Sequence, residues 1–259
     1  MEAVLYICHG SRMKKACEEA RAFVEACMER VPLPIQEFSF LELAEPAIEQ
    51  GFRRCVEQGA TKIYAVPVLL LTAAHAKHDI PEVLTKLHTQ YPHVDIVYGR
   101  PFGVHESISD ILYERILETK VSLDQDSLVL LVGRGSSDPD VKRDLGDIAS
   151  LFKKKYQLKR VEICFLTAAD PIFEDVLEEV KGFSYSKVFI IPYLLFTGLL
   201  MKRIEKAVRT VENEGHQQFI LTHYLEYHPH LQDVLIKRVE ELMHFPSGEG
   251  DGLTCIPLC

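Results

Sequence analysis

Short apolar runs alternate with longer amphipathic segments along most of the chain. In the first half, the apolar runs predict strands at 3–8, 35–43, 62–71 and 94–98. The amphipathic segments between and after them predict helices at 12–30, 45–57, 80–90 and 105–119. Strands that alternate with helices are typical of βαβ units, so the pattern predicts an α/β fold with a largely parallel sheet.

The second half of the chain repeats this pattern at a fixed spacing. Three marker residues recur 125 positions later, namely Gly10 as Gly135, Pro46 as Pro171 and Pro67 as Pro192. A constant spacing over three separate segments indicates an internal duplication. We therefore predict two α/β halves, 1–121 and 122–245, that meet at a polar linker, and a disordered tail at 246–259.

The stretch from Pro67 to Leu84 places two histidines between an apolar strand and a helix. His75 and His78 lie in a predicted loop, Asp79 is expected to cap the helix, and Pro81 suits its first turn. In open α/β sheets, ligands bind beyond the carboxyl ends of the strands. This loop is therefore a candidate site.

The duplication also serves as an internal control for residues that carry chemistry. The three candidate residues align with unrelated ones in the second copy, namely His9 with Arg134, Glu42 with Thr167 and His75 with Leu200. A structural role would be needed in both copies, so their joint loss indicates one functional site, in the first half. Neighbouring strands lie about 4.8 Å apart, so we expect the three side chains to converge. Two imidazoles and a carboxylate suit a divalent first-row metal, and they also move protons near neutral pH.

Composition narrows the class of protein further. The chain has 259 residues and a net charge of −9, which argues against general affinity for nucleic acid. Its apolar runs are too short for a membrane span, and its first residues lack a signal-peptide pattern. The seven cysteines are odd in number and scattered, which favours reduced thiols and a cytoplasmic location.

These motifs resemble those of the class II chelatases. The resemblance rests on H-G-S-R at 9–12, F-L-E-L at 40–43 and L-L-L-T-A-A-H-A-K-H-D-I-P at 69–81, and covers roughly residues 1–243. It implies two flavodoxin-like domains that face each other across a cleft. The implied activity is ATP-independent insertion of Fe²⁺ into the tetrapyrrole sirohydrochlorin, with Co²⁺ insertion as the alternative. The implied catalytic and metal-binding residues are His9 and His75, with Glu42 nearby.

The resemblance also implies cationic groups that hold the carboxylate-rich edge of sirohydrochlorin. The expected substrate-binding residues are Ser11, Arg12, Lys77 and Arg134, and Arg203 is a further candidate. The basic residues have a simpler interpretation as a solvated rim. Because the metal would be a substrate, we expect no permanently bound cofactor. We also expect a monomer, since two fused halves already form one cleft.

Two other functions remain open at this stage. A histidine phosphatase also carries a strand-end His-Gly, but that chemistry needs an arginine beside the nucleophile, and here Cys8 precedes His9. A metal or tetrapyrrole carrier would use the same residues without turnover. The metal, Fe²⁺ or Co²⁺, cannot be chosen from the ligand types because both ions accept them.

Overall fold

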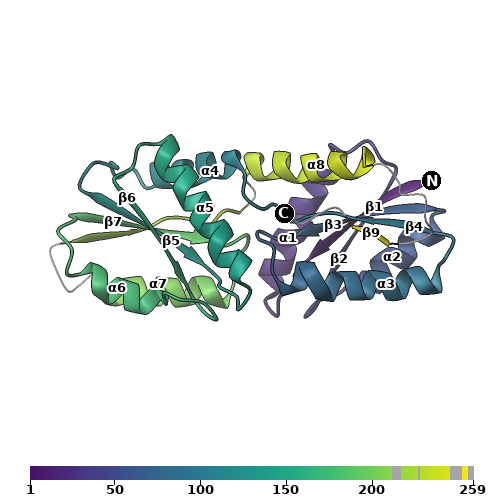
Figure 1. Cartoon of the computed structure of the whole chain (residues 1–259), viewed down its shortest axis with the longest axis horizontal. Coiled ribbons are helices and arrows are strands. Elements are labelled where there is room, and N and C mark those ends of the chain that lie inside the picture. Colours follow the sequence, from purple (N-terminus) through teal and green to yellow (C-terminus); the bar gives the residue numbers. More distant parts are fainter. Residues whose placement is uncertain (212–216, 227, 246–252, 256–259) are drawn as a thin grey trace. The chain divides into compact units, whose positions relative to one another are not determined.

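The computed structural model describes residues 1–211, 217–226, 228–245 and 253–255. The chain divides into two compact units, Met1–Gly103 with Gln232–Cys259 and Val104–Leu231. In each unit, helices lie on both faces of a parallel β-sheet (Figure 1). The predicted α/β class is therefore confirmed.

The first unit is built around strand β1, which lies between two parallel neighbours. Its sheet begins in the order β2-β1-β3-β4. These strands are β1 (Glu2–Cys8), β2 (Ile35–Phe40), β3 (Lys62–Val68) and β4 (Asp95–Tyr98). Because helices cover both faces, the central strand is apolar from Ala3 to Cys8, and these residues are all buried. The order sets the carboxyl ends of β2, β1 and β3 side by side.

Three helices of the first copy pack their apolar stripes onto this sheet. They are α1 (Lys14–Met28), α2 (Ile48–Glu57) and α3 (Ile80–Gln90). Phe52 of α2 and Leu84 of α3 are fully buried in one core with Ile7 of β1. A π-helical turn, His75–Asp79, leads directly into α3. The sequence predicted a loop here, but the helical backbone already begins at His75.

The second unit repeats the arrangement, as the duplication predicts. Its sheet has the order β6-β5-β7-β8 and is parallel throughout. The strands are β5 (Ser127–Gly133), β6 (Arg160–Phe165), β7 (Lys187–Tyr193) and β8 (Gln218–Leu221). The helices that follow the first three strands are α5 (Pro139–Lys155), α6 (Phe173–Val180) and α7 (Leu199–Val211).

The predicted boundary at residue 121 separates the two copies of the sequence pattern but not the two compact units. Helix α4 (Glu106–Glu118) closes the first copy yet belongs to the second unit. Helix α8 (Pro229–Met243) closes the second copy yet lies mainly in the first unit. The two copies thus exchange their last helices, which an amphipathic pattern alone does not reveal because it does not say which sheet a helix covers.

One buried arginine secures each exchanged helix. Arg115 of α4 donates from Nη2 to the carbonyl oxygen of Leu225 at 2.6 Å. Arg238 of α8 donates from Nη2 to the carbonyl oxygen of Phe102 at 2.6 Å. Each guanidinium satisfies a backbone acceptor that would otherwise be buried without a partner.

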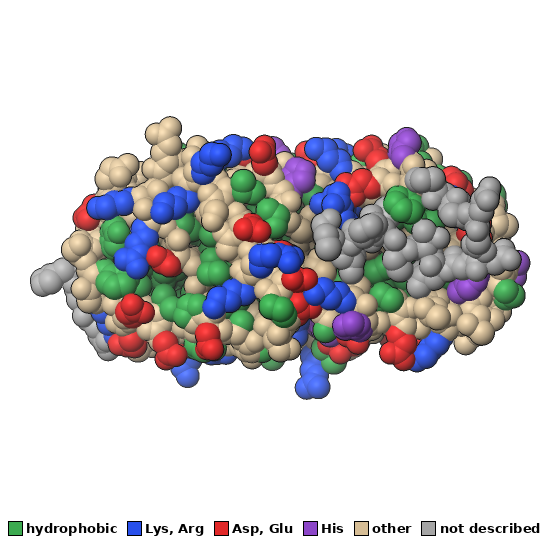
Figure 2. Space-filling model, viewed as in Figure 1, with side chains coloured by type: hydrophobic (Ala, Val, Ile, Leu, Met, Phe, Trp, Pro, Cys, Tyr) green, Lys and Arg blue, Asp and Glu red, His purple; other side chains and the backbone are tan. Residues whose placement is uncertain are grey.

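The end of the chain departs from the predicted disordered tail in one place. Leu253–Cys255 form β9, which pairs in parallel with β4 and extends the first sheet. Residues 246–252 and 256–259 lie outside the described part of the chain. Within the described part, no helix is both long and apolar enough to span a membrane. On the face that Figure 2 shows, cationic and anionic side chains are interspersed.

Candidate metal-binding site

The site begins where β1 and β2 run out side by side. The parallel register pairs Cys8 with Phe40, and the next residues continue the pairing beyond the strands. The backbone N–H of Leu41 donates to Cys8 O at 2.8 Å, and that of Glu42 donates to His9 O at 3.1 Å. These two bonds hold Glu42 beside His9.

Gly10 allows this close approach of the two loops. Its φ is +94°, a conformation that side chains disfavour, and an added Cβ would lie 1.8 Å from Glu42 O. Gly135 repeats the arrangement in the second unit, with φ +92° and a Cβ position 1.8 Å from Thr167 O. The backbone of this tip is therefore the same in both copies, and only the side chains differ.

The structure brings the three predicted residues together in the first unit. One ligand atom each from His9, Glu42 and His75 lies within 4.8 Å of the others. Nε2 of His9 is 3.6 Å from Oε1 of Glu42. The two imidazole rings are 4.8 Å apart between centroids and almost perpendicular, at 89°. Both histidines are half-buried and Glu42 is exposed, so the cluster opens to solvent.

Oxygen atoms occupy the Nδ1 side of both imidazoles. Nδ1 of His9 lies 3.1 Å from Gly10 O, and Nδ1 of His75 lies 2.6 Å from Oδ2 of Asp79. A carbonyl oxygen and an ionised carboxylate can only accept, so in each neutral ring Nδ1 carries the hydrogen. The lone pair of each ring is then on Nε2. Two imidazole nitrogens and one carboxylate oxygen form a donor set for a divalent first-row ion that leaves coordination positions open.

Asp79 does not act as the predicted helix cap. Its φ of −66° and ψ of −49° are helical, and its side chain makes no capping hydrogen bond. Because the π-helical turn runs straight into α3, the helix has no free N-terminus at this residue. The carboxylate turns back to His75 instead. The spacing of four residues between the two is the only sequence signal that could have indicated this pair.

Cys8 adds no ligand to the site. It is buried in β1, and burial raises the pKa of its thiol to about 12. The thiol therefore stays protonated near neutral pH and does not offer a thiolate. Cys8 and four other cysteines are free thiols, namely Cys17, Cys27, Cys55 and Cys164.

The predicted substrate-binding residues differ in their hydrogen bonds, their exposure and the unit to which they belong. The hydroxyl of Ser11 accepts from Met13 N at 3.1 Å, and Ser136 accepts from Asp138 N at the same distance. Since the contact recurs in both copies, it indicates a scaffold role for Ser11. Arg12 is exposed and Lys77 is half-buried, and both flank the cluster in sequence. Arg134 is exposed and belongs to the other unit.

Arg203, the counterpart of His78, serves its own unit. It forms a two-pronged ion pair with Glu174, at 2.6 and 2.7 Å, and donates to the carbonyl oxygen of Leu166. The same contact with Arg203 lowers the pKa of Glu174. The guanidinium thus fixes the loop after β6, whereas His78 in the first unit is exposed.

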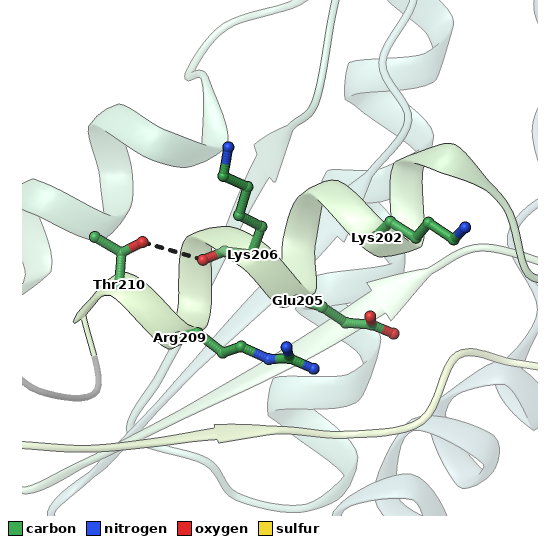
Figure 3. Close-up of a pocket in the computed structure, with 5 residues that line it drawn as sticks. All are labelled: Lys202, Glu205, Lys206, Arg209 and Thr210. Carbon is green, nitrogen blue, oxygen red and sulfur yellow. Dashed lines mark hydrogen bonds between the residues drawn. The ribbon is translucent and has the colours of Figure 1, made fainter.

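A surface depression on α7 is separate from the metal-ligand cluster. It is lined by five residues from successive turns of that one helix, namely Lys202, Glu205, Lys206, Arg209 and Thr210 (Figure 3). The Thr210 hydroxyl donates to the carbonyl oxygen of Lys206 at 3.1 Å. This arrangement is an ordinary helix surface with mixed charges.

The fold and the cluster define a duplicated α/β protein with a set of potential metal ligands in its first copy. The CbiX family model matches the chain twice, at residues 3–119 and 128–242. The chain belongs to the CbiX family.

Similar proteins include two from Priestia megaterium. A sirohydrochlorin ferrochelatase is 54% identical over 251 residues, which cover 97% of this chain and 94% of the relative. A sirohydrochlorin cobaltochelatase is 37% identical over 246 residues, which cover 93% and 80%. The solved structure of SirB from Bacillus subtilis with Fe³⁺ has a TM-score of 0.89 and 46% identity, covering 97% of this chain and 99% of that one.

Proposed function

We propose that the chain is a metal chelatase that inserts Fe²⁺ into sirohydrochlorin without ATP. The observation that carries the proposal is the cluster of His9, Glu42 and His75, whose ligand atoms lie within 4.8 Å of one another. Similarity to a sirohydrochlorin ferrochelatase over 97% of the chain, at 54% identity, supports the choice of reaction.

In the proposed mechanism, the two imidazoles first bind the metal ion and then accept protons from the tetrapyrrole. Nε2 of His9 and Nε2 of His75 bind the entering ion with the carboxylate of Glu42, and other coordination positions stay open for the ring nitrogens. As the ion passes to the macrocycle, two Nε2 lone pairs are released. The same two lone pairs accept the two pyrrolic N–H protons that leave the ring. Charge is conserved, because one divalent ion enters the ring as two protons depart.

The substrate is rich in carboxylates, whereas the chain has a net charge of −9. Binding therefore needs a local set of cations. We assign that task to Arg12 and Lys77, which flank the cluster in sequence, and to Arg134 in the second copy.

Insertion of Co²⁺ is the second candidate reaction. It is favoured by the 37% identity to a sirohydrochlorin cobaltochelatase over 93% of this chain. The donor set of nitrogen and carboxylate ligands suits either ion. Parallel assays with Fe²⁺ and Co²⁺ at equal free-ion concentrations would rank the two by kcat/KM.

The proposed enzyme works as a monomer in the cytoplasm, with sirohydrochlorin and the metal ion as substrates and no resident cofactor. A metal or tetrapyrrole carrier would share the site but would form at most one equivalent of product per chain. Several equivalents of siroheme per chain, followed by absorbance under anaerobic conditions, would therefore exclude the carrier.

The decisive test of the site removes each imidazole in turn. In His9→Ala and in His75→Ala, we expect the rate of iron insertion to fall about 10²–10⁴-fold, because each change removes a metal ligand and a proton acceptor. His78→Ala is the matched control, since His78 is an exposed histidine three residues from His75. Near-wild-type insertion in both His9→Ala and His75→Ala would refute the assignment.

A further inference from the structure

We propose that Asp79 is a positioning residue, which holds the His75 ring so that Nε2 is its metal-binding and proton-accepting atom. This inference rests on the proposed function of the site. Oδ2 of Asp79 lies 2.6 Å from Nδ1 of His75, a short contact of the kind that hydrogen bonds to a carboxylate form. Partners of this kind fix the tautomer and orientation of ligating histidines in metal sites.

The backbone of this segment is specialised for the pair. The π-helical turn begins at His75 and ends at Asp79, and the N–H of Ile80 donates to His75 O. Such wide turns are rare and occur frequently at functional sites. In the second unit, the equivalent segment is part of the ordinary α-helix α7 (Leu199–Val211).

The second copy also lacks the chemistry of the pair. The counterparts of His75 and Asp79 are Leu200 and Ile204, and Ile204 is fully buried in the core of its unit. The histidine, the carboxylate and the wide turn are therefore absent together. A residue that only supported the fold of α3 would have no reason to be lost along with the ligand that it contacts.

The Nδ1–H groups of the two imidazoles donate to different kinds of acceptor. His9 uses the backbone carbonyl of Gly10, which no substitution removes. His75 uses a side chain with 49% of its area exposed, so it can be replaced with little effect on packing. Asp79→Asn is the informative change, because an amide can turn its NH₂ group toward Nδ1 and so favour the opposite tautomer.

The same helix offers a matched control. Glu82 and Lys86 form a pair with the same spacing and the same distance, 2.6 Å, and both are exposed on α3. This pair has no ligand role. Glu82→Gln therefore reproduces the loss of one carboxylate charge and one i,i+4 contact without touching His75.

The first measurement reads the tautomer directly, without metal or tetrapyrrole. Long-range ¹H–¹⁵N NMR of the ¹⁵N-histidine-labelled full chain, at about pH 8, should show His75 with its hydrogen on Nδ1. In Asp79→Asn we expect a mixed or Nε2-protonated His75. Glu82→Gln should match the wild type.

The second measurement is titration with Co²⁺ alone, followed by its visible d–d absorbance. We expect Asp79→Asn and Asp79→Ala to weaken Co²⁺ binding about 10–100-fold, with partial recovery in Asp79→Glu and no change in Glu82→Gln. A wild-type His75 tautomer and wild-type Co²⁺ affinity in Asp79→Asn would overturn the inference. Neither readout uses sirohydrochlorin, so a failure of the proposed reaction would be seen separately, as absence of siroheme formation by the wild type.

Discussion

The two copies of the duplicated sequence share a backbone at their strand tips and differ in what that backbone presents. In both, a glycine with positive φ allows one loop to contact the next. A Cβ added to either glycine would lie 1.8 Å from a carbonyl oxygen of the neighbouring loop. The first copy presents His9 and Glu42 there, and the second presents Arg134 and Thr167. The geometry of the tip is thus set by the scaffold, and the chemistry is a separate choice of side chains.

In the second copy, the residues equivalent to His78 and Asp79 stabilise the fold of their own unit. Arg203 replaces His78 and binds Glu174 and the loop after β6. Ile204 replaces Asp79 and is buried in the core. The first copy therefore has solvent-exposed ionisable side chains at these positions, whereas the second has a buried apolar residue and an ion-paired arginine.

The largest effect is expected from adding a methyl group at either glycine. Gly10→Ala and Gly135→Ala should each lower the free energy of unfolding by at least about 2 kcal/mol, because each combines left-handed backbone strain with a clash. Only Gly10→Ala should also lose Co²⁺ affinity, since it displaces Glu42. Urea denaturation and Co²⁺ titration measure the two effects. Equal loss of Co²⁺ affinity in Gly135→Ala would show that metal binding does not depend on the first copy alone.

The exchanged helices offer a second paired test. Arg115→Met and Arg238→Met should each lower the free energy of unfolding by about 1–3 kcal/mol, because each leaves a buried carbonyl without its donor. Neither arginine lies in the cluster, so Co²⁺ affinity should stay at the wild-type value. The exposed Arg53 provides the control, and Arg53→Met should change stability by less than about 0.5 kcal/mol. Changes below about 0.5 kcal/mol in all three variants would show that neither buried arginine stabilises its helix.

The smallest effect is expected at the paired serines. Ser11→Ala and Ser136→Ala should cost similar amounts, about 0.5–1.5 kcal/mol, because each loses the same hydrogen bond to a backbone N–H. We expect an unchanged KM for sirohydrochlorin in both. A rise in KM confined to Ser11→Ala would show that this hydroxyl also contacts the substrate, as the sequence analysis first suggested.

The sequence predicted the parallel fold and the three-residue cluster because both follow from register. A constant spacing of 125 residues aligned the strand tips and marked His9 and His75 as positions that only one copy needs. The role of Asp79 was not predictable in the same way. Aspartate before Ile-Pro-Glu is the ordinary signal of a helix cap, and nothing local distinguishes it from a partner of His75.

Two other features could not be predicted because they depend on tertiary contacts. The sequence pattern of α4 shows an apolar stripe but does not show which sheet the helix covers, so the sequence does not predict the exchange of helices. The tail has no strand-like pattern, yet Leu253–Cys255 pair with β4. A short edge strand of this kind is selected by the open edge of the sheet rather than by its own sequence.

The most direct test gives the first copy the side chains of the second. The triple variant His9→Arg, Glu42→Thr and His75→Leu uses the residues of the second copy. Two of them stand at a strand tip with the same backbone in both copies, and the third replaces a half-buried helical residue, so the variant should keep its fold. Calorimetric titration should then find one Co²⁺ site per chain in the wild type and none in the variant. Binding of one Co²⁺ by the variant at wild-type affinity would contradict the central claim, that the first copy alone holds the working site.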